Sequence, residues 1–341
     1  MSKNFKDIGE FEFIDKISSG CLMRPERVIK AIGDDAAAFK VASDKVMLVT
    51  TDLLIEQVHF IKEATTGFDL GYKALAVNLS DIAAMGGTAR EAFVSIGIPA
   101  ACAIDFIEDF YRGLKSLAAE FNVNILGGDT TGSKTDLIIN IAVVGSVAPE
   151  EMLGRNHAQT GDLIFSTGFL GDSRAGLHLL LNPSDTDPES WSQLKQAHLR
   201  PRPHLNQGRF LAAQPSVHAA IDVSDGLSSD LPHILRASAK GARLTAANIP
   251  VSKQLEHFCR HFHFDPIAYA LAGGEDYTLV CTVAPDQAET IARAFEQQFG
   301  QPLFNIGTIT PSGPLEILGL NGEIQPVDKS GWDHFQKDLG T

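Results

Sequence analysis

Residues 71–87 constrain the fold most, because this stretch is apolar on nearly every side and yet carries a carboxylate. It reads Gly-Tyr-Lys-Ala-Leu-Ala-Val-Asn-Leu-Ser-Asp-Ile-Ala-Ala-Met-Gly-Gly. Its apolar residues recur at helical spacing, and the two final glycines suit a left-handed helix cap. A helix that is apolar all round is normally buried. Asp81, with Asn78 one turn before it, therefore predicts a carboxylate inside the protein, which is costly unless a cation meets it.

Two interpretations of Asp81 are open. It could form an ion pair with Lys73 or Arg90, or it could belong to a group of carboxylates around a cation. We favour the group, because three other apolar runs also end on an aspartate. The acidic residues at breaks beside apolar segments are Asp35, Asp52, Asp81, Asp129, Asp222 and Asp225. For any one of them a helix cap or a turn is the commoner role, but the set favours a shared site.

Such a set of carboxylates predicts divalent metal ions. Two unit charges about 4 Å apart repel by about 4 kcal/mol at an effective dielectric constant of about 20. A cluster without cations would therefore protonate or unfold. Mg²⁺ prefers carboxylate oxygens and shares its coordination shell with substrate phosphates. The hydroxyls of Thr50, Thr51 and Ser224 stand beside these carboxylates, whereas histidine and cysteine are absent from the motifs, which argues against zinc.

Composition narrows the classes of protein. The chain has 341 residues, enough for two domains of ordinary size. A formal charge of −14 argues against nucleic acid or an anionic membrane as partner. No apolar run reaches transmembrane length, and the first residues lack the apolar core of a signal peptide. The four cysteines are scattered, as is typical of reduced thiols. We therefore expect a cytoplasmic protein with no nucleic-acid or membrane partner.

The order of the expected elements predicts an α+β protein of two domains. In the first half, strands at 45–52, 92–98, 123–126 and 137–147 outnumber helices at 71–87 and 104–121. This favours a mixed sheet with helices on one side over a doubly wound fold. A glycine-rich loop is expected at 127–132. The polar segment 149–156 predicts a boundary between an N-terminal domain, 1–148, and a C-terminal domain, 149–341.

Familiar nucleotide and nucleophile motifs are absent or incomplete. Residues 127–135 fail the spacing of a Walker loop, because Ser133 follows Gly132 where lysine is required. Residues 168–171 are too short for a dinucleotide fingerprint and predict a tight turn. No Gly-x-Ser-x-Gly elbow occurs. His59 alone is more often a structural residue.

Several segments, taken together and in order, resemble the thiamine-monophosphate kinase family, within the superfamily of aminoimidazole ribonucleotide synthetase. They are Gly33-Asp34-Asp35, Thr50-Thr51-Asp52 with His59, residues 72–81 ending at Asp81, Gly127-Gly128-Asp129, residues 221–227, Gly273-Gly274-Glu275-Asp276-Tyr277 and Gly331-Trp332-Asp333-His334-Phe335. The resemblance spans almost the whole chain. The His59 segment, the Glu275 segment and the Trp332 segment are more specific to the kinase than to the superfamily.

The resemblance implies a fold and a reaction. The N-terminal mixed-sheet domain would form the barrel-like core of a homodimer and bind ATP and several Mg²⁺ ions. The C-terminal α+β domain would complete the nucleotide and substrate site. The γ-phosphoryl group of ATP would pass directly and in line to thiamine monophosphate, which is the last step of thiamine diphosphate biosynthesis. The attacking phosphate oxygen is already ionised, so no general base is expected.

The resemblance also implies a role for individual residues. Metal ions would be held by Asp35, Thr50, Thr51, Asp52, Asp81, Asp129, Asp222 and Asp225. ATP would be contacted by Gly127, Gly128, Arg155, Ser224 and Tyr111, and the thiamine portion by His59, Glu275 and Trp332. Arg155 would add a fixed cation at the phosphates, and Glu275 would favour the cationic thiazolium. Trp332 would stack on a substrate ring, with a hydrophobic plug as the alternative.

Two other functions remain open from the sequence. The chain could be another ATP-dependent synthetase of the same superfamily, although such relatives usually lack the tail around Trp332. It could instead be a non-catalytic acidic metal-binding or scaffold protein. Binding of a nucleotide would separate the enzymes from the scaffold.

Overall fold

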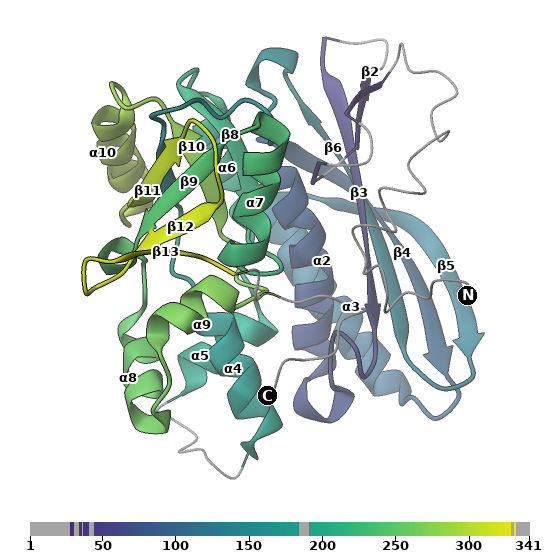
Figure 1. The fold of residues 1–341 in the computed structure, drawn as a ribbon. Coiled ribbons are helices and arrows are strands. Elements are labelled where there is room, and N and C mark those ends of the chain that lie inside the picture. Colours follow the sequence, from purple (N-terminus) through teal and green to yellow (C-terminus); the bar gives the residue numbers. More distant parts are fainter. Residues whose placement is uncertain are drawn as a thin grey trace, which may run out of the picture.

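The computed structural model describes residues 28–30, 34–35, 37–40, 44–183, 191–328 and 331. Two mixed β-sheets lie on either side of helix α2 (Gly67–Ala84), which occupies the centre of the molecule (Figure 1). The prediction of an α+β fold with mixed sheets is confirmed. Among the described residues, no helix has the length and apolarity that a membrane span requires.

The first sheet has the strand order β1-β2-β3-β6-β4-β5. Its strands are β1 (Val28–Lys30), β2 (Ala37–Lys40), β3 (Val46–Ile55), β4 (Thr88–Pro99), β5 (Asn124–Ser133) and β6 (Ile138–Val147). Strands β4 and β5 pair in parallel, and the other neighbours are antiparallel. The mixed pairing matches the sequence-based expectation for the first half of the chain.

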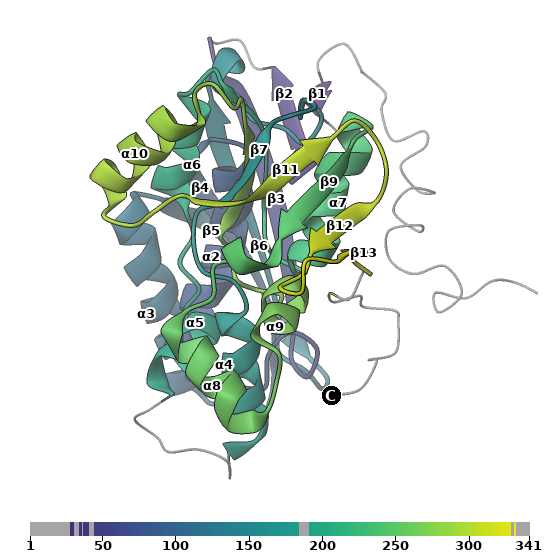
Figure 2. The same cartoon turned by 60° about the vertical axis from the view of Figure 1, so that its left-hand side comes forward.

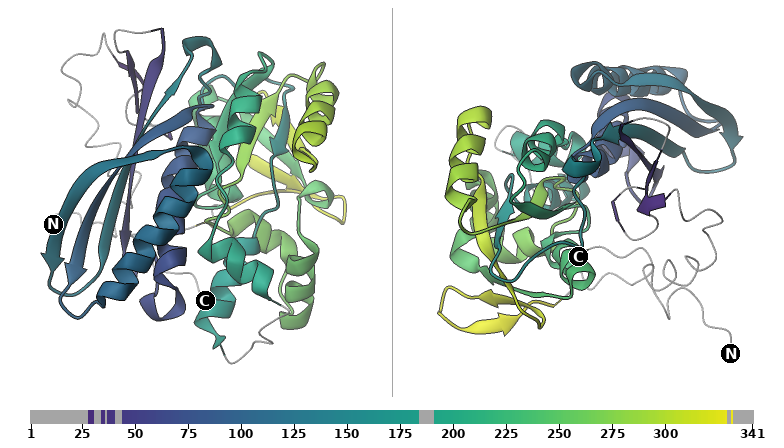
Figure 3. Two further views of the ribbon diagram at one scale, coloured as in Figure 1. Left: turned by 180° about the vertical axis from the view of Figure 1, so that it is seen from behind. Right: turned by 90° about the horizontal axis from the view of Figure 1, so that it is seen from above.

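Helices α2 and α3 (Ile104–Phe121) cover one face of this sheet. They approach closely because each has a glycine at the contact. A Cβ on Gly71 would lie 1.8 Å from the Phe110 carbonyl oxygen, and one on Gly113 would lie 1.9 Å from that of Phe68. No helix of the described residues covers the opposite face (Figure 3), where the apolar side chains of Leu53, Phe93 and Ile138 are exposed.

Helix α2 is buried, as its apolar surface predicts. Its flanks contact the first sheet, helix α6 (Leu205–Ala212) and strand β8 (Val217–Asp222), so both halves of the chain pack on it. It begins four residues earlier than the sequence indicates, because the Thr66 hydroxyl accepts a hydrogen bond from the Asp69 amide at 3.1 Å. Gly86, with φ of +70°, follows its last turn.

The second sheet has the strand order β13-β12-β9-β11-β7-β10-β8. Its remaining strands are β7 (Leu163–Ser166), β9 (Gly241–Thr245), β10 (Leu279–Val283), β11 (Phe304–Thr310), β12 (Leu315–Leu318) and β13 (Ile324–Pro326). Helices α7 (Leu227–Ser238) and α10 (Ala288–Phe299) lie beside this sheet (Figure 1). Among the described strands of this second sheet, β9 and β12 pair in parallel and the other neighbours are antiparallel.

Four further helices form a separate group at one end of the second sheet (Figure 2). They are α4 (Asp172–Leu181), α5 (Ser192–Leu199), α8 (Lys253–Phe262) and α9 (Pro266–Ala272). An apolar cluster of their own holds them together, with Trp191, Phe258 and Tyr269 among its members. This group places His198, at the end of α5, beside α2.

The expected loop at 127–132 is instead part of strand β5. Gly128 explains the difference, because it fits a strand position that no other residue could occupy. Its φ is +145°, and a Cβ there would lie 1.7 Å from the Val94 carbonyl oxygen on β4. Gly128 therefore allows a close approach of two strands here, whereas glycine more often marks a turn.

Candidate functional site

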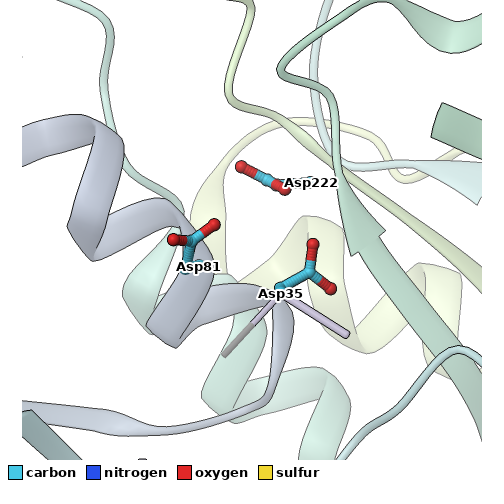
Figure 4. Close-up of side chains that lie close together, drawn as sticks. All are labelled: Asp35, Asp81 and Asp222. Atoms are coloured by element: carbon cyan, nitrogen blue, oxygen red, sulfur yellow. The ribbon is translucent and has the colours of Figure 1, made fainter. Parts of the chain in front are cut away.

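Three carboxylates from distant parts of the sequence converge between the two sheets. Asp35 lies between β1 and β2, Asp81 lies near the end of α2, and Asp222 is the last residue of β8. One oxygen of each lies within 4.8 Å of the others, and Figure 4 shows the three side chains directed toward one another. The expectation that separate apolar runs deliver their aspartates to one place is met by these three residues.

Neighbouring hydroxyls and a fourth carboxylate surround this group. Thr50 donates a hydrogen bond to Oδ2 of Asp81, and Ser80 donates one to Oδ2 of Asp222 at 2.7 Å. Asp52 follows Thr50 by two residues on β3 and therefore shares its face of the sheet. Its Oδ2 atom is buried and has no hydrogen-bond partner among the described residues. We call Asp35, Asp52, Asp81 and Asp222 the acid cluster.

The acid cluster carries more negative charge than the cations of the described residues balance. Burial raises the pKa of Asp35 to about 8, an effect that Arg155 only partly offsets, and burial raises that of Asp52 to about 6. Burial raises the pKa of Asp81 well above its usual value, and the charges of Asp52 and Asp222 raise it further. Without added cations, these carboxylates would compete to hold protons near neutral pH.

Arg155 is the cation that contacts the cluster directly. Its guanidinium donates to both oxygens of Asp35, and its Nε lies 3.5 Å from Oδ1 of Asp34. Lys30 forms a second ion pair with Asp34 at 2.9 Å. Arg155 therefore stands beside the carboxylates, where a phosphate would also meet it.

The alternative ion pairs for Asp81 are wrong. The ammonium of Lys73 lies 2.9 Å from Glu275 instead. Arg90 is exposed on β4 and forms no ion pair with a described residue. Because neither cation reaches Asp81, its burial among other carboxylates calls for a different partner.

The residues present fit a hard divalent cation. The donors are carboxylate and hydroxyl oxygens, which Mg²⁺ prefers, and no histidine or cysteine of the described residues belongs to the converging group. The orphaned Oδ2 of Asp52 supplies a buried acceptor that a cation would satisfy. These observations support a magnesium site at the acid cluster.

The loop after β8 carries two more of the predicted residues, Ser224 and Asp225. The carboxylate of Asp230 accepts hydrogen bonds from the amides of Asp225 and Gly226, both at 3.0 Å, and so fixes the loop. A Cβ on Gly331 would lie 2.1 Å from the Asp225 carbonyl oxygen. The tail thus contacts this loop at Gly331, whereas Trp332 lies outside the described residues.

Glu275 lies in a second ionic group beside the first. Its carboxylate contacts Lys73 at 2.9 Å and Nδ1 of His198 at 3.2 Å. The charge of His59 also acts on it, so two of the predicted substrate residues are neighbours. Burial raises the pKa of Glu275, but Lys73 and His198 outweigh that effect and bring it below the usual value.

The remaining predicted residues lie apart from the acid cluster within one chain. Thr51 points to the opposite face of β3, where Asn140 donates to its hydroxyl at 2.8 Å. Asp52 is aligned across β6 and β4 with Gly128, three strand spacings or about 14 Å away. Asp129 and Gly127 lie on the same strand as Gly128, β5, and are therefore also distant. Their assigned roles stay predictions.

Tyr111 also lies away from the acid cluster. It is half-buried on α3 and lines a surface groove of about 430 Å³ with Ile98, Ile104 and Ile107. An apolar groove with one aromatic wall could accept a flat ring, but nothing in one chain connects it to the acid cluster. Its role at the nucleotide stays a prediction.

Sequence reasoning missed the residues that support the site through hydrogen bonds. Ser80, Lys73, His198 and Asp230 are all buried and all contact a predicted site residue. A signal was present for Ser80 and Lys73, because both are polar residues in an apolar helix. The sequence gave no signal for His198, because its partner Glu275 is distant in sequence, or for Asp230, because its partners are backbone amides.

Comparisons with known proteins agree with this geometry. Residues 33–147 match the family model described as AIR synthase related protein, N-terminal domain, and residues 159–318 match its C-terminal counterpart. The thiamine-monophosphate kinase of Escherichia coli (strain K12) is 36% identical over 341 residues, covering 96% of this chain and 98% of that protein. The chain belongs to the thiamine-monophosphate kinase family.

Other family members give the same result. The thiamine-monophosphate kinase of Buchnera aphidicola subsp. Schizaphis graminum (strain Sg) is 35% identical over 331 residues, covering 96% of this chain and 99% of that protein. A solved structure described as "AaThiL complexed with AMPPCP and TMP" has a TM-score of 0.85 and 31% identity, covering 98% of this chain and 100% of that chain. The fold and the enzyme class expected from the sequence motifs are thereby confirmed.

Proposed function

We propose that this member of the family transfers the γ-phosphoryl group of ATP to the phosphate of thiamine monophosphate. The product is thiamine diphosphate, so the reaction completes the synthesis of that compound. The observation that carries the proposal is the convergence of Asp35, Asp81 and Asp222 in a chain that resembles, over nearly its whole length, a protein complexed with AMPPCP and TMP. AMPPCP is an analogue of ATP, which supports ATP as the phosphoryl donor.

We propose that several Mg²⁺ ions are held by the acid cluster, with Thr50 and Asp225 beside it. The raised pKa values of Asp35 and Asp52 support this, because both carboxylates gain from a nearby positive charge. When bound, the ions would neutralise the repulsion between two polyanionic substrates and align them. Thr51 and Asp129 stay in the proposed ligand set on the strength of the family resemblance.

The chain's own residues bind and orient the substrates. Arg155, which donates to Asp35, is placed to donate to a substrate phosphate as well and to stabilise negative charge on the transferred group. It would be freed from Asp35 for that role by metal ions held at the acid cluster. The accepting phosphate oxygen is ionised at neutral pH, so none of these residues has to remove a proton. Catalysis therefore rests on positioning and on charge.

Helix α2 sets the distance between the two groups of residues that would bind the two ends of thiamine monophosphate. Asp81 and Lys73 are eight residues apart on it, which corresponds to about 12 Å along the axis. The acid cluster at one end suits the reacting phosphates. Glu275, on which the charge of His59 acts, lies at the other end and suits the thiamine portion. Trp332 stays assigned to that portion by the family resemblance alone.

We propose a homodimer in which the N-terminal domain, 1–148, packs through the open face of its sheet, while residues 149–341 form the C-terminal domain. The side chains of Leu53, Phe93 and Ile138 are 48%, 38% and 36% exposed on that face, which supports an interface there. The proposed contacts to ATP are Gly127, Gly128, Tyr111, Ser224 and Arg155. The first three of these residues lie far from the acid cluster within one chain. Their position favours a site that a second copy completes.

Two further parts of the proposal concern the surroundings of the protein. The excess of acidic residues leaves nucleic acid and anionic membranes as poor partners. The three cysteines among the described residues are free thiols, which supports the cytoplasm as its location.

Direct detection of the product tests the proposal. The purified protein is incubated with ATP, thiamine monophosphate and Mg²⁺, and thiamine diphosphate is separated and quantified by chromatography. We expect formation of product that stops when a chelator removes Mg²⁺. Absence of product, together with Mg²⁺ binding but no ATP binding in calorimetry, would instead favour a metal-binding scaffold. Turnover of ATP with a different acceptor would favour another synthetase.

A further inference from the structure

The second ionic group consists of Lys73, Glu275 and His198, and it lies deep between the two halves of the chain. Nζ of Lys73 is 2.9 Å from both carboxylate oxygens of Glu275 and 3.4 Å from Nε2 of His198. Nδ1 of His198 is 3.2 Å from Oε2 of Glu275. The three residues come from α2, from the segment after α9 and from the end of α5.

Burial of a lysine at this point needs a reason beyond helix packing. Lys73 is only 3% exposed, and most of the residues that follow it in the helix are apolar. A buried ammonium is costly unless it is paired and fully hydrogen-bonded, and an apolar residue of similar size would pack more cheaply. The position therefore points to a requirement that Lys73 meets through Glu275.

His198 completes the arrangement as a neutral ring. Burial and the charge of Lys73 lower its pKa to about 4, so the imidazole is uncharged at neutral pH. In the tautomer that satisfies both neighbours, Nε2 accepts from Lys73 and Nδ1–H donates to Glu275. The Ser173 hydroxyl, 3.1 Å from Nδ1, is a second neighbour of the nitrogen that faces Glu275.

The backbone around Glu275 is fixed as firmly as its side chain. Glu275 has a left-handed φ of +61°, and its amide donates to the Ser224 carbonyl oxygen at 2.7 Å. The next residue, Asp276, accepts hydrogen bonds from the amides of Gly171 and Ser173 at the start of α4. Lys73 and His198 thus hold the carboxylate of Glu275 along one edge, while 29% of the Glu275 side chain remains exposed.

We propose that Lys73 and His198 are positioning residues, which hold the carboxylate of Glu275 so that its free edge meets the cationic ring of thiamine monophosphate. This inference rests on the proposed function. A carboxylate has about four lone-pair sites, so the edge that Lys73 and His198 leave open can still accept a further contact. A side chain that is already ordered loses less conformational freedom when the substrate binds. The two residues should therefore affect the affinity for thiamine monophosphate and leave that for ATP unchanged.

Steady-state kinetics of a mutant cycle tests this role. The variants are Lys73→Met, Glu275→Gln and the double variant, each assayed with thiamine monophosphate and with ATP as the varied substrate. We expect Lys73→Met to raise the KM for thiamine monophosphate about tenfold, with the KM for ATP and kcat nearly unchanged. In the Glu275→Gln background, Lys73→Met should add nothing, because the residue acts through that carboxylate. Lys73→Arg should restore most of the affinity.

A matched control separates positioning from general support of the fold. Arg200 forms an ion pair with Asp69 in the first turn of the same helix, and it stacks on Phe68, with its guanidinium carbon 4.7 Å from the ring centroid. Arg200→Met therefore removes another bond between α2 and the C-terminal half without touching Glu275. We expect a lower melting temperature and an unchanged KM for thiamine monophosphate.

Several results would overturn the inference. They are an unchanged KM for thiamine monophosphate in Lys73→Met, an equal rise for both substrates, or an additive rise in the double variant. If Lys73→Met does not fold, His198→Leu serves in its place, because it removes the imidazole and keeps an apolar side chain at that position. We then expect the KM for thiamine monophosphate to rise about threefold. If the wild-type protein forms no thiamine diphosphate, the proposed function fails. Calorimetric binding of thiamine monophosphate to the same variants then decides the positioning role by itself.

Discussion

Two buried ionic groups lie along helix α2, and they are balanced in opposite ways. The acid cluster gathers four carboxylates, and the guanidinium of Arg155 contacts only one of them, Asp35. The group around Lys73 contains one ammonium, one carboxylate and a neutral imidazole. The pKa shifts follow the same division: they are upward for Asp35 and Asp52, and downward for Glu275.

The difference shows how function can be read from charge balance. A balanced group is complete as it stands, so its purpose is to hold a side chain in place. An unbalanced group of buried carboxylates is incomplete, and the missing charge must come with a ligand. We therefore propose that the same helix supports a recognition element at Lys73 and a cation-dependent element at Asp81.

Removal of one acid-cluster carboxylate should have the largest effect. We expect Asp52→Asn to lower kcat by about 10²–10³-fold, because an electrostatic contribution to the transition state is lost. Its melting temperature without Mg²⁺ should be unchanged or higher, since repulsion within the cluster decreases. The matched control is Asp162→Asn, which removes a buried carboxylate paired with His218 elsewhere. A variant at Asp52 with near wild-type turnover would remove this residue from the metal set.

Loss of charge in the balanced group should act on one substrate only. We expect Glu275→Gln to raise the KM for thiamine monophosphate about 10–100-fold, the range of a lost hydrogen bond to a charged partner. The KM for ATP should change little. Initial-rate measurements with each substrate varied in turn give both constants. Parallel changes in both would mean that the two groups are not functionally distinct.

The stability of the metal-free protein should depend on pH through the acid cluster. The folded-state pKa of Asp35 is about 8, against 3.8 when unperturbed, so the folded state holds a proton that the unfolded state has lost. The free energy of unfolding should therefore fall as the pH rises from about 4 to about 8, by on the order of 1 kcal/mol per pH unit, and should level off above pH 8. The most informative window is from about pH 6.5 to about pH 8, where unperturbed carboxylates are already ionised in both states. Neither Glu275 nor His198 titrates in this window, because their pKa values are shifted downward.

Denaturant titrations at several pH values measure this slope. Mg²⁺ should abolish it and raise the melting temperature, since the cation favours the ionised carboxylates. Asp35→Asn should make the slope measurably shallower in the absence of Mg²⁺, and the remainder should come from the other buried aspartates whose pKa is raised, such as Asp81. A slope that persists unchanged in this variant would assign the effect to other groups.

The tail should give the smallest effect. We expect Trp332→Ala to raise the KM for thiamine monophosphate about threefold, the effect of losing a cation–π contact of about 0.5–1 kcal/mol, and to leave the KM for ATP unchanged. Kinetics with both substrates checks this. Equal changes would mean that the tail shapes the site only in a general way.

The sequence alone allowed part of this site to be predicted. A carboxylate in an all-apolar helix required burial and a cation, and this placed Asp81 in a shared site with Asp35 and Asp222. The sequence also put Thr50 and Thr51 beside these carboxylates, and in the structure Thr50 lies on the strand face of Asp52 and donates to Asp81. Alternation along β3 sends Thr51 to the other face, which a run of adjacent motif residues does not reveal.

The balanced group could not be predicted, because its members are linked only by the fold. Lys73 and Glu275 are 202 residues apart, and His198 sits on a helix that sequence patterns did not identify. Glycines 127 and 128 suggested a loop, since glycine usually signals a turn, but here Gly128 serves a close approach of two strands. Spacing along the chain cannot distinguish these two uses.

The central claim is that the acid cluster becomes balanced only when divalent cations bind. A crystal grown with Mn²⁺ and a non-hydrolysable ATP analogue, measured at the manganese absorption edge, tests it most directly. We predict anomalous peaks within about 2.0–2.3 Å of oxygens of Asp81 and Asp222, the usual range for hard divalent ions. A map with a bound nucleotide and no peak at these carboxylates would contradict the claim.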